Sequence, residues 1–455
     1  MPPTLRKRRT SDDSPPPPAK SDVDKSARYP DVHKLVRPSI LSSETKHPST
    51  VRVSNDNNSF RGFLNLCLIL LFLSNLRVVI ENIRKYGVLV DFIPPVGDRE
   101  AGPAVFITTL YVIPIAVAWA TERLAVALPN VVTHRVAVIV HVVNTSAEVI
   151  FPGYLIQVLE PGFLAAVAVM MVGSMVFMKL VSYASVNREL RVLYEAGKLP
   201  KVPKKPMESG DAWLQYPDNL TVSNMIFFLA VPSFCYQLNY VRTPRIRPKF
   251  LAKRIAEWLG IFVVLISFFQ QYMMPVVTNT MPAIEGHHWS LVGERLLKIA
   301  VPNLAQWLLG FYHFFHVYLN IMAEITRFGD RHFYSDWWNS TTLADFWRTW
   351  NLPVHNWLMR HVYKPLLRRG VSRPSAVLII FFISSFFHEY LVSVPARSLK
   401  LWAFMSMMIQ APLVLLGQKL KGKTAGNIFF WVSILVGQPV VLLLYYQDHY
   451  IRHLA

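Results

Sequence analysis

Long apolar runs, separated by polar or basic segments, recur along the chain from residue 64 onwards. A helix of about 20 apolar residues crosses the hydrocarbon core of a bilayer, and we predict nine such helices. They cover residues 64–80, 104–122, 135–158, 162–185, 257–281, 298–324, 374–394, 400–418 and 426–447. The fifth and sixth runs carry polar residues, which favours long and tilted helices. The pattern therefore predicts an all-α polytopic membrane protein.

The segment before these runs has a different composition. Residues 1–62 are polar, include four consecutive prolines at positions 15–18, and carry too little apolar surface to fold alone. We predict a disordered cytosolic arm over 1–62 and a membrane domain over 63–455. A basic cluster at residues 6–9 suits contact with anionic lipid, and an ordinary solvated tail is the alternative. No cleavable signal peptide is recognised, so we expect the first span to direct insertion.

Positive charge is concentrated in three segments between the predicted spans. These segments cover residues 187–256, 326–373 and 419–423, after the fourth, sixth and eighth spans. With a cytosolic N-terminus, nine spans place all three on the cytosolic side, as the positive-inside rule requires. The C-terminus is then expected in the lumen, and an error of one span would break this agreement.

Composition narrows the classes of function. The formal net charge is +19, yet charged residues make up only 16% of the chain, against about 25% in soluble domains. Because the excess charge lies outside the apolar runs, it indicates topology and anionic lipid rather than nucleic-acid binding. The two cysteines, Cys67 and Cys235, cannot form a disulfide framework and lack metal-binding spacing.

A tryptophan-rich segment precedes the seventh span. Its residues Leu343, Phe346, Trp347 and Trp350 recur at positions i, i+3, i+4 and i+7, which gives one apolar stripe on a short helix. The other face is polar, so we predict that this helix lies in the plane of the membrane interface. An aromatic belt at the headgroup level is the alternative; it explains the tryptophans but not the polar residues among them.

The sequence also predicts where this short helix begins and ends. Thr342 with Asp345 offers an N-terminal cap. Pro353 disfavours helical geometry at Leu352, so we expect the chain to bend beside Asn351 and then to re-enter a helix.

His388 and Glu389 lie side by side in the seventh span. An ionisable residue there costs about 2.5–3.5 kcal/mol on insertion scales and is therefore a candidate functional group. A neutral imidazole in a low-dielectric site suits general-base work, in which it takes a hydroxyl proton as the oxygen attacks an activated acyl carbon. A packed histidine with one satisfied hydrogen bond is the alternative. The Glu389 carboxylate, by contrast, needs a partner or a wet cavity.

Covalent catalysis has weaker support from the sequence. Ser384 and Ser385 lie one helical turn before His388, but no G-x-S-x-G elbow is present, so both are expected to line the pocket. Neither cysteine has a histidine nearby in sequence. We therefore expect acyl transfer in one step, without a covalent acyl-enzyme.

Uncharged amides are candidates to stabilise a developing oxyanion in such a site. Asn351, Gln410 and Gln438 stand among apolar neighbours, although each is alternatively an interhelical hydrogen-bond partner. His313 and His316 are spaced i, i+3 but have no acidic residue nearby in sequence, so metal binding is not expected.

Two motifs resemble those of a known family. Residues 333–339 read Phe-Tyr-Ser-Asp-Trp-Trp-Asn, similar to the FYxDWWN motif of the sterol and diacylglycerol branch of the membrane-bound O-acyltransferases. Residues 387–390 read Phe-His-Glu-Tyr, similar to that family's essential-histidine segment. Further segments resemble the diacylglycerol side in particular: 234–247, 328–331, 351–355, 388–395 and 437–439. The resemblance covers nearly everything after residue 60, and Ser335 occupies the variable position of the first motif.

This resemblance implies both a fold and an activity. The fold would surround a buried catalytic chamber with spanning and interfacial helices. The enzyme would lie in the endoplasmic reticulum and esterify 1,2-diacylglycerol with an acyl group from acyl-CoA, giving triacylglycerol. Acyl-CoA is then a substrate, and no cofactor is implied. Members of this branch assemble as dimers or tetramers, so a homodimer or homotetramer is expected.

The resemblance also assigns residues. His388 is the catalytic residue that it carries over. Support of the thioester or the pocket is implied for Asn351, Gln410, Gln438, Glu389 and Met407. Contacts with CoA or the acyl chain are implied for Phe333, Tyr334, Asp336, Trp337, Trp338, Asn339, Trp350, His355, Tyr363 and Ser384.

Substrate chemistry agrees with this assignment, and two other functions stay open. Polyanionic CoA matches the positive charge of residues 326–373 on the expected cytosolic side, while the fatty chain and diacylglycerol can enter from lipid. A sterol O-acyltransferase shares much of the tryptophan-rich segment. A lipid or solute transporter with His388 as a proton relay belongs to a different class, although the paired halves typical of transporters are not detected.

Overall fold

A computed structural model describes residues 76, 80–90, 98–200, 207, 209–280, 286 and 289–453. Within these residues all regular secondary structure is helical, apart from one isolated β-bridge between Arg242 and Phe328. The all-α fold class predicted from the sequence is confirmed. The predicted arm over 1–62 and most of the first predicted span lie outside the described residues.

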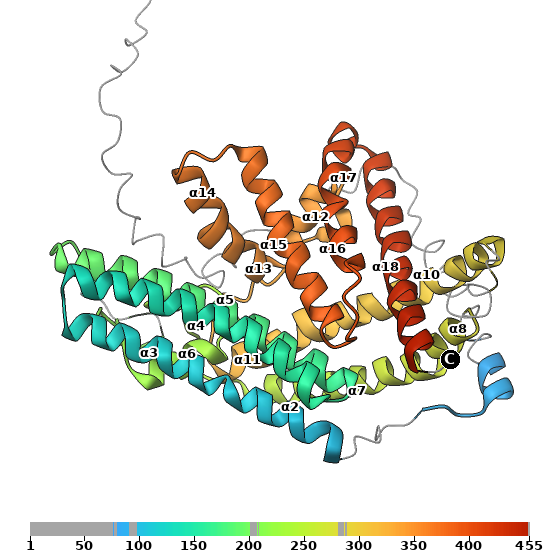
Figure 1. Cartoon of the computed structure of the whole chain (residues 1–455), viewed down its shortest axis with the longest axis horizontal. Helices are drawn as coiled ribbons and strands as arrows, with labels where there is room; N and C mark the ends of the chain where they lie inside the picture. Colours follow the sequence, from blue (N-terminus) through green and yellow to red (C-terminus); the bar gives the residue numbers. More distant parts are fainter. Residues whose placement is uncertain are drawn as a thin grey trace, which may run out of the picture.

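The helices follow one another along the chain as labelled in Figure 1. Their bounds are α2 (Asp98–Leu110), α3 (Val112–Ala127), α4 (Val131–Leu159), α5 (Phe163–Glu195), α6 (Val222–Ala230), α7 (Pro248–Phe268), η4 (Phe269–Met273), α8 (Met274–Thr278), α10 (Trp289–Phe311), η5 (Tyr312–Tyr318), α11 (Leu319–Ile325), η6 (Trp337–Asn339), α12 (Leu343–Thr349), α13 (Leu352–Leu358), η7 (Met359–Tyr363), α14 (Lys364–Arg368), α15 (Arg373–Ser393), α16 (Trp402–Met408), α17 (Gln410–Gly417), η8 (Gln418–Leu420) and α18 (Thr424–His453).

Seven helical stretches in the described residues are long and apolar enough to cross a membrane. They run over Ala101–Ala127, Val132–Leu159, Phe163–Glu195, Pro248–Thr278, Arg373–Ser393, Trp402–Leu420 and Thr424–Asp448. Each overlaps one of the predicted spans, so the protein is a multi-pass membrane protein. The total of nine stays a prediction.

The predicted span over 298–324 differs from the others. It lies within α10, η5 and α11, which follow one another without a break from Trp289 to Ile325. This stretch is not among the seven that are apolar enough to cross a membrane. Polar side chains account for the difference, because Asn303, Gln306, His313 and His316 interrupt its apolar surface.

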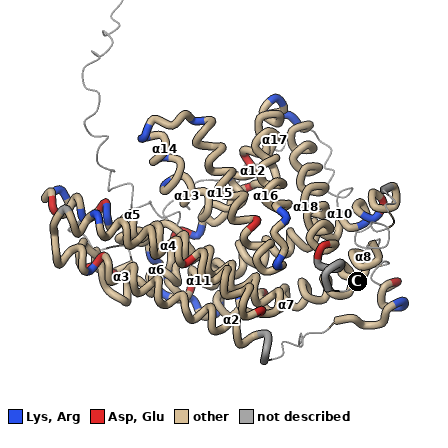
Figure 2. Tube along the Cα trace, in the orientation of Figure 1, with Lys and Arg blue, Asp and Glu red and all other residues tan. Residues whose placement is uncertain are grey.

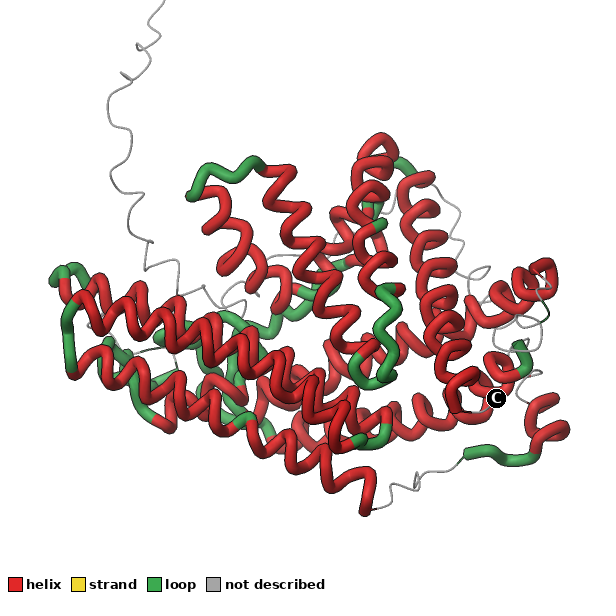
Figure 3. Tube along the Cα trace, viewed as in Figure 1, coloured by secondary structure: helices red, strands yellow, loops and turns green. Residues whose placement is uncertain are grey.

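Two groups of helices make up the bundle. Figure 1 shows α3, α4 and α5 side by side in one group and α15, α16 and α18 in the other, with α7 and α10–α11 passing below the second group. A loop between Val394 and Leu401 joins α15 to α16 at the lower side in Figure 3. The groups meet where the Tyr390 hydroxyl of α15 donates to the Val149 carbonyl of α4.

A buried ion network joins the helices of the first group. The Glu122 carboxylate of α3 accepts from the Arg191 guanidinium of α5 at 2.6 Å, and the His141 Nε2 of α4 lies 2.9 Å from the other carboxylate oxygen. Glu122 is fully buried and Arg191 is 2% exposed. A charge buried to this extent is stable only when it is paired, so each of the three helices fixes its neighbours.

Removing the cation should destabilise the bundle. Arg191→Met leaves the buried Glu122 carboxylate without its charge partner, and the expected loss is about 3–5 kcal/mol of unfolding free energy. The double variant Glu122→Leu/Arg191→Met removes both charges and should recover most of that loss. Thermal unfolding of the purified protein in detergent measures both. Equal melting temperatures for wild type and Arg191→Met would contradict a stabilising role for this network.

Candidate active site

His388 lies in the last two turns of α15. One hydrogen bond of its ring shows which of the two ring nitrogens carries the proton. Its Nδ1 is 2.7 Å from the backbone carbonyl oxygen of Ser384, one turn earlier on the helix. A carbonyl oxygen can only accept, so Nδ1 carries the proton and Nε2 keeps its lone pair. Nε2 has no hydrogen bond to any residue that the structure describes. The half-buried ring therefore offers a proton acceptor at Nε2.

The direction of His388 follows from its neighbours on the helix. Phe381 lies seven residues earlier, so both side chains project from nearly the same side of α15. The Phe381 ring packs edge-to-face on Trp347 of α12 with the ring centroids 6.4 Å apart. His388 is thus turned to the side of α15 that faces the tryptophan-rich segment.

The buried Glu389 carboxylate has the hydrogen-bond partners that a carboxylate in an apolar helix needs. Its carboxylate accepts from the backbone N–H groups of Leu401 at 2.9 Å and Phe404 at 3.0 Å, and from the Tyr445 hydroxyl of α18 at 2.8 Å. Both N–H groups belong to the N-terminus of α16, where helical donors lack partners within the helix. Glu389 therefore ties α15 to α16 and α18 and holds the helix that carries His388.

Asn351 lies at the predicted bend, which the structure confirms. Helix α12 ends at Thr349, α13 begins at Leu352, and the Asn351 Oδ1 accepts from the Val354 N–H at 3.2 Å as the N-cap of α13. The Nδ2 group has no hydrogen bond to a described residue. One end of this amide thus fixes the turn, and the other end is left to donate.

Helix α12 has the predicted N-terminal cap, and its apolar stripe is buried. Thr342 accepts from the Asp345 N–H at 3.0 Å, which confirms the cap. Leu343 and Phe346 are 1% and 4% exposed and belong to a core cluster with Phe430 of α18. The apolar stripe is buried against protein rather than exposed to lipid, and the position of this helix in the plane of the membrane interface stays a prediction. Period and polarity alone cannot distinguish lipid from a neighbouring helix.

The motif at residues 333–339 divides between core and surface. Phe333 and Trp337 are 3% and 1% exposed, whereas Asp336, Trp338 and Asn339 are exposed. The Trp337 ring lies in an aromatic cluster with rings from α10, α12 and α18. An aromatic belt requires side chains at the lipid surface, so that interpretation was wrong for Trp337. Its predicted contact with acyl-CoA is not tested by this burial.

Tyr334 links the motif to the long helical stretch over 289–325. Its hydroxyl lies 2.8 Å from Nδ1 of His316, and its ring packs edge-to-face on Phe311. His313 lies one turn before His316 and stacks on Trp258 of α7. The two histidines therefore have different partners, and in the described part of the chain no group of three His, Cys, Asp or Glu side chains could hold a metal ion.

The other predicted amides have different surroundings. Gln410 begins α17 and is half-buried, and its side chain has no hydrogen bond to a described residue. Met407, three residues earlier, is 7% exposed. The Gln438 Oε1 of α18 lies 3.4 Å from the Asn303 Nδ2 of α10, which is the interhelical pairing considered from the sequence. Gln410 is thus the less constrained donor of the two glutamines.

The remaining predicted contacts lie on the segment from Trp350 to Tyr363 and on α15. Trp350 stacks on Phe346 with the ring centroids 5.7 Å apart. His355 on α13 and Tyr363 on η7 are half-buried. The Ser384 hydroxyl lies 3.5 Å from Nδ1 of His388. Trp350 lies directly before the predicted bend at Asn351, and His355 and Tyr363 follow it.

His361 on η7 has a strongly lowered pKa. Burial lowers the pKa of His361 to about 3, and the Arg360 guanidinium beside it acts in the same direction. Its Nε2 is buried and without a hydrogen bond to described residues. The folded state therefore holds this imidazole uncharged at neutral pH.

Tyr445 and Glu148 both lie in apolar runs, and neither was identified as a candidate residue from the sequence. Tyr445 gave no signal, because a tyrosine in a span is usual. Glu148 in α4 did give one, since a carboxylate inside an apolar run needs a partner, yet it was not singled out. Glu148 is 4% exposed.

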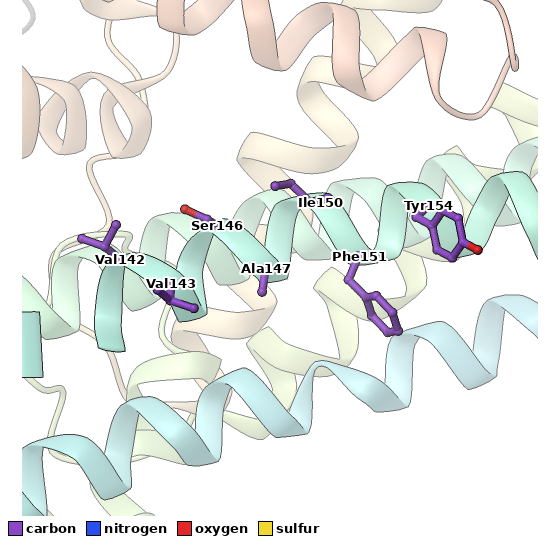
Figure 4. A pocket seen from close by; sticks show the side chains of 7 residues that line it. All are labelled: Val142, Val143, Ser146, Ala147, Ile150, Phe151 and Tyr154. Atoms are coloured by element: carbon purple, nitrogen blue, oxygen red, sulfur yellow. The ribbon is translucent and has the colours of Figure 1, made fainter. Parts of the chain in front are cut away.

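The outward face of α4 carries a shallow apolar groove of about 550 Å³, shown in Figure 4. Its lining includes Val143, Ser146, Ile150 and Tyr154, all from this one helix. The groove is not next to His388. It is part of the apolar surface that a membrane protein exposes to lipid.

We expect Glu389 to stabilise the packing of α15 and to take no part in the chemical step. Tyr445→Phe removes one of its three donors and should lower the unfolding free energy by about 1 kcal/mol with turnover retained. Glu389→Leu leaves three donors unpaired and should cost several times more. Thermal unfolding in detergent and acyl-transfer turnover are measured for each variant. A Glu389→Leu protein as stable as wild type would show that these hydrogen bonds do not hold α15.

Stability should depend on pH through His361. In the unfolded chain the pKa of a histidine is about 6.5. As the pH falls from about 6.5 towards 3, the unfolded chain therefore binds a proton that the folded state excludes, and stability is lost. His361→Gln cannot titrate and should flatten this part of the profile. Melting temperatures at pH 7.5, 6.5 and 5.5 test this, and equal slopes for both proteins would refute it.

Comparisons with known proteins agree with the motifs. Residues 123–447 match the membrane-bound O-acyltransferase family (MBOAT). Diacylglycerol O-acyltransferase 1 of Bos taurus is 41% identical over 406 residues, which cover 87% of this chain and 82% of that protein. The protein of the same name from Dictyostelium discoideum is 40% identical over 415 residues, 91% of this chain but only 64% of its own length. Diacylglycerol O-acyltransferase 1A of Glycine max is 38% identical over 449 residues, 94% of this chain and 85% of that protein.

Proposed function

The chain belongs to the membrane-bound O-acyltransferase family, and from that premise we propose that it transfers a fatty acyl group from acyl-CoA to the free hydroxyl of 1,2-diacylglycerol. The products are triacylglycerol and free CoA. The names of the relatives support diacylglycerol as the acceptor. We place the enzyme in the endoplasmic reticulum membrane with a cytosolic N-terminus. A homodimer or homotetramer is part of the proposal, and no cofactor is required because acyl-CoA is a substrate.

His388 is the general base. The observation that carries this role is the hydrogen bond from Nδ1–H to the Ser384 carbonyl, which leaves Nε2 as the proton acceptor. Nε2 takes the hydroxyl proton as the oxygen attacks the thioester carbon, and negative charge develops on the carbonyl oxygen. Collapse restores the carbonyl and breaks the C–S bond, and the departing thiolate takes the proton from Nε2. Protons and charge balance at the end of the cycle.

Amide donors stabilise the oxyanion in this proposal. The Asn351 Nδ2 group and the Gln410 amide have no hydrogen bond to a residue that the structure describes, and a preorganised donor of this kind is worth about 10²–10³ in turnover. Gln438 is engaged with Asn303 and supports the helices beside the pocket. Met407 contributes an apolar wall. Glu389 acts through its hold on α15.

Direct transfer is favoured over a covalent acyl-serine. Ser385 is fully buried and donates its hydroxyl hydrogen to the Phe381 carbonyl at 2.7 Å. Ser384 lies closest to Nδ1, the ring nitrogen that already carries a proton and cannot accept another. Neither hydroxyl therefore has a free base beside it.

The acyl-CoA side is assigned to the end of the bundle that carries basic residues. Figure 2 shows Lys and Arg at the ends of α14 and at the turn between α17 and α18, along the same upper edge. They belong to two of the three basic segments predicted for the cytosolic side, 326–373 and 419–423. CoA contacts are proposed for Trp350, His355, Tyr363 and Ser384 and for the motif at residues 333–339. Bringing thioester and alcohol to one base makes the attack effectively intramolecular.

We expect turnover to depend on the imidazole of His388. His388→Ala should lower kcat by about 10²–10⁴ without unfolding the protein. His134→Ala is the matched control, because this histidine lies at the start of α4, outside both α15 and the motif at residues 333–339. The assay incubates purified protein with labelled oleoyl-CoA and either diacylglycerol or cholesterol, and the labelled neutral lipid is identified. Near-normal turnover in His388→Ala removes the base from the mechanism, and a cholesteryl ester product reassigns the acceptor.

Turnover should also respond to the amide donors. Asn351→Asp keeps the cap oxygen but loses the amide donor, so kcat should fall about 10²-fold with little change in stability. Gln410→Leu should lower kcat by a similar factor. The same assay and thermal unfolding in detergent separate the two effects. If both variants turn over normally, the amide-pocket idea fails while His388 can remain the base. Transfer by purified protein without any gradient also excludes transport as the primary role.

A further inference from the structure

The bend that carries Asn351 is held by a second segment, residues 333–335. The two segments are joined by two backbone hydrogen bonds, from the Ser335 N–H to the Thr349 carbonyl at 2.8 Å and from the Leu352 N–H to the Phe333 carbonyl at 3.0 Å. These bonds enclose Tyr334 on one segment and Trp350 with Asn351 on the other. The backbone from which the Asn351 amide projects is therefore fixed by residues 333–335 as well as by its own helix cap.

The Tyr334 side chain anchors this pair of segments to η5. Its hydroxyl lies 2.8 Å from Nδ1 of His316, and its ring packs edge-to-face on Phe311 with the ring centroids 5.0 Å apart. Only two links therefore separate His316 from Asn351. The first is the side-chain hydrogen bond to Tyr334, and the second is the pair of backbone bonds on either side of Tyr334.

His316 is itself held by neighbours on its own helix. The Tyr312 ring stacks on the imidazole with the ring centroids 4.8 Å apart, and the Asn320 side chain donates to the His316 backbone carbonyl at 2.7 Å. Residues Tyr312–Tyr318 form a π-helix within the helical stretch over 289–325. Turns of this kind are rare and frequently lie at functional sites. An imidazole held in this way can hold the tyrosine hydroxyl that it contacts.

A second contact ties the same helical stretch to the segment before the motif. The Arg331 guanidinium forms an ion pair with the Glu324 carboxylate of α11 at 2.7 Å, and Glu324 is fully buried. This ion pair does not depend on His316. Loss of the His316 bond should therefore release the Tyr334 end of the segment while the rest stays packed on the bundle.

We propose that His316 is a positioning residue for the acyl transfer, and that it acts through Tyr334 to fix the direction of the Asn351 Nδ2 group. The inference rests on the proposed function, in which this amide donates to the oxyanion. A donor of this kind is effective only when it already points to the place where negative charge develops. A small rotation of the bend should therefore lower kcat and leave the KM for both substrates unchanged.

Loss of the hydrogen bond at either end should lower turnover by the same factor. His316→Phe keeps a ring beside Tyr312 but has no nitrogen for the tyrosine, and Tyr334→Phe removes the hydroxyl. Each should lower kcat by about 10-fold, less than the about 10²-fold expected when the Asn351 donor is lost outright. The double variant should be no slower than either single variant, because both remove one and the same bond. In His316→Phe the KM for acyl-CoA and for diacylglycerol should equal the wild-type values.

The Asn351→Asp background separates positioning from a general loss of structure. Without the amide donor nothing is left for His316 to position, so adding His316→Phe should lower kcat only about 1–2-fold further. A general loosening of the protein would lower kcat by the same factor in both backgrounds. A fall of about 10-fold that persists in Asn351→Asp overturns the inference, as does a wild-type kcat in His316→Phe.

A conservative variant and a matched control complete the kinetic test. His316→Asn keeps a hydrogen-bonding atom near the position of Nδ1 and should restore most of the turnover, which an acid–base role would not allow because an amide does not titrate. His313 lies on the same π-helix, stacks on Trp258 and has no hydrogen bond from Nδ1 to a described residue. His313→Phe should keep the wild-type kcat. An equal loss in this control, or no recovery in His316→Asn, would contradict the role of the hydrogen bond.

Amide hydrogen exchange measures the same link without turnover. In His316→Phe the N–H groups of Ser335 and Leu352 should exchange about 10-fold faster than in wild type, since about one hydrogen bond of local stability is lost. Amides of α5 should exchange as in wild type. Unchanged exchange at Ser335 and Leu352 would show that His316 does not hold the bend. Failure of the proposed function would instead be seen as absence of triacylglycerol from wild type, and the exchange rates would still decide this link.

Discussion

The carboxylate of Glu389 holds together the part of the bundle on which the candidate site depends. It accepts two N–H groups from the start of α16 and the hydroxyl of Tyr445 on α18, so one side chain joins three helices. His388 is the residue next to it on α15. Because a helix fixes the angle between successive side chains, anchoring Glu389 on one side of α15 also fixes the side to which the imidazole points.

The same rule, that a buried polar group needs partners, explains most of the charged residues inside the bundle. Glu122 is paired with Arg191 and His141. Lys179 on α5 donates to three backbone carbonyls just beyond and within the last turn of α6, at 2.7 to 2.9 Å. Glu148 departs from this rule, because neither of its carboxyl oxygens has a hydrogen bond to a residue that the structure describes.

The candidate site combines one base with donors from separate elements. The base is fixed by its own helix, through the bond from Nδ1–H to the Ser384 carbonyl. The Asn351 amide is fixed by a bend, since its oxygen caps α13. The tryptophan-rich segment, which includes α12, packs against α10, α17 and α18, and this packing holds the bend against the bundle. The direct acyl transfer that we propose needs this preorganisation, because it has no covalent intermediate that would divide the reaction into easier steps.

Apolar period and length were enough to determine the all-α class and seven overlapping spans, since a bilayer demands long apolar helices whatever their neighbours. The cap at Thr342 and the bend beside Asn351 were predictable for a similar reason, because caps and proline act within a few residues. The sequence also singled out His388 as an ionisable residue in a span. Partners distant in the chain were not predictable: the burial of the α12 stripe against α18, the pairing of Gln438 with Asn303, and the cap that Glu389 gives to α16. Only tertiary structure decides these, because a pattern fixes which face of a helix is apolar or polar but not which helix comes to lie against it.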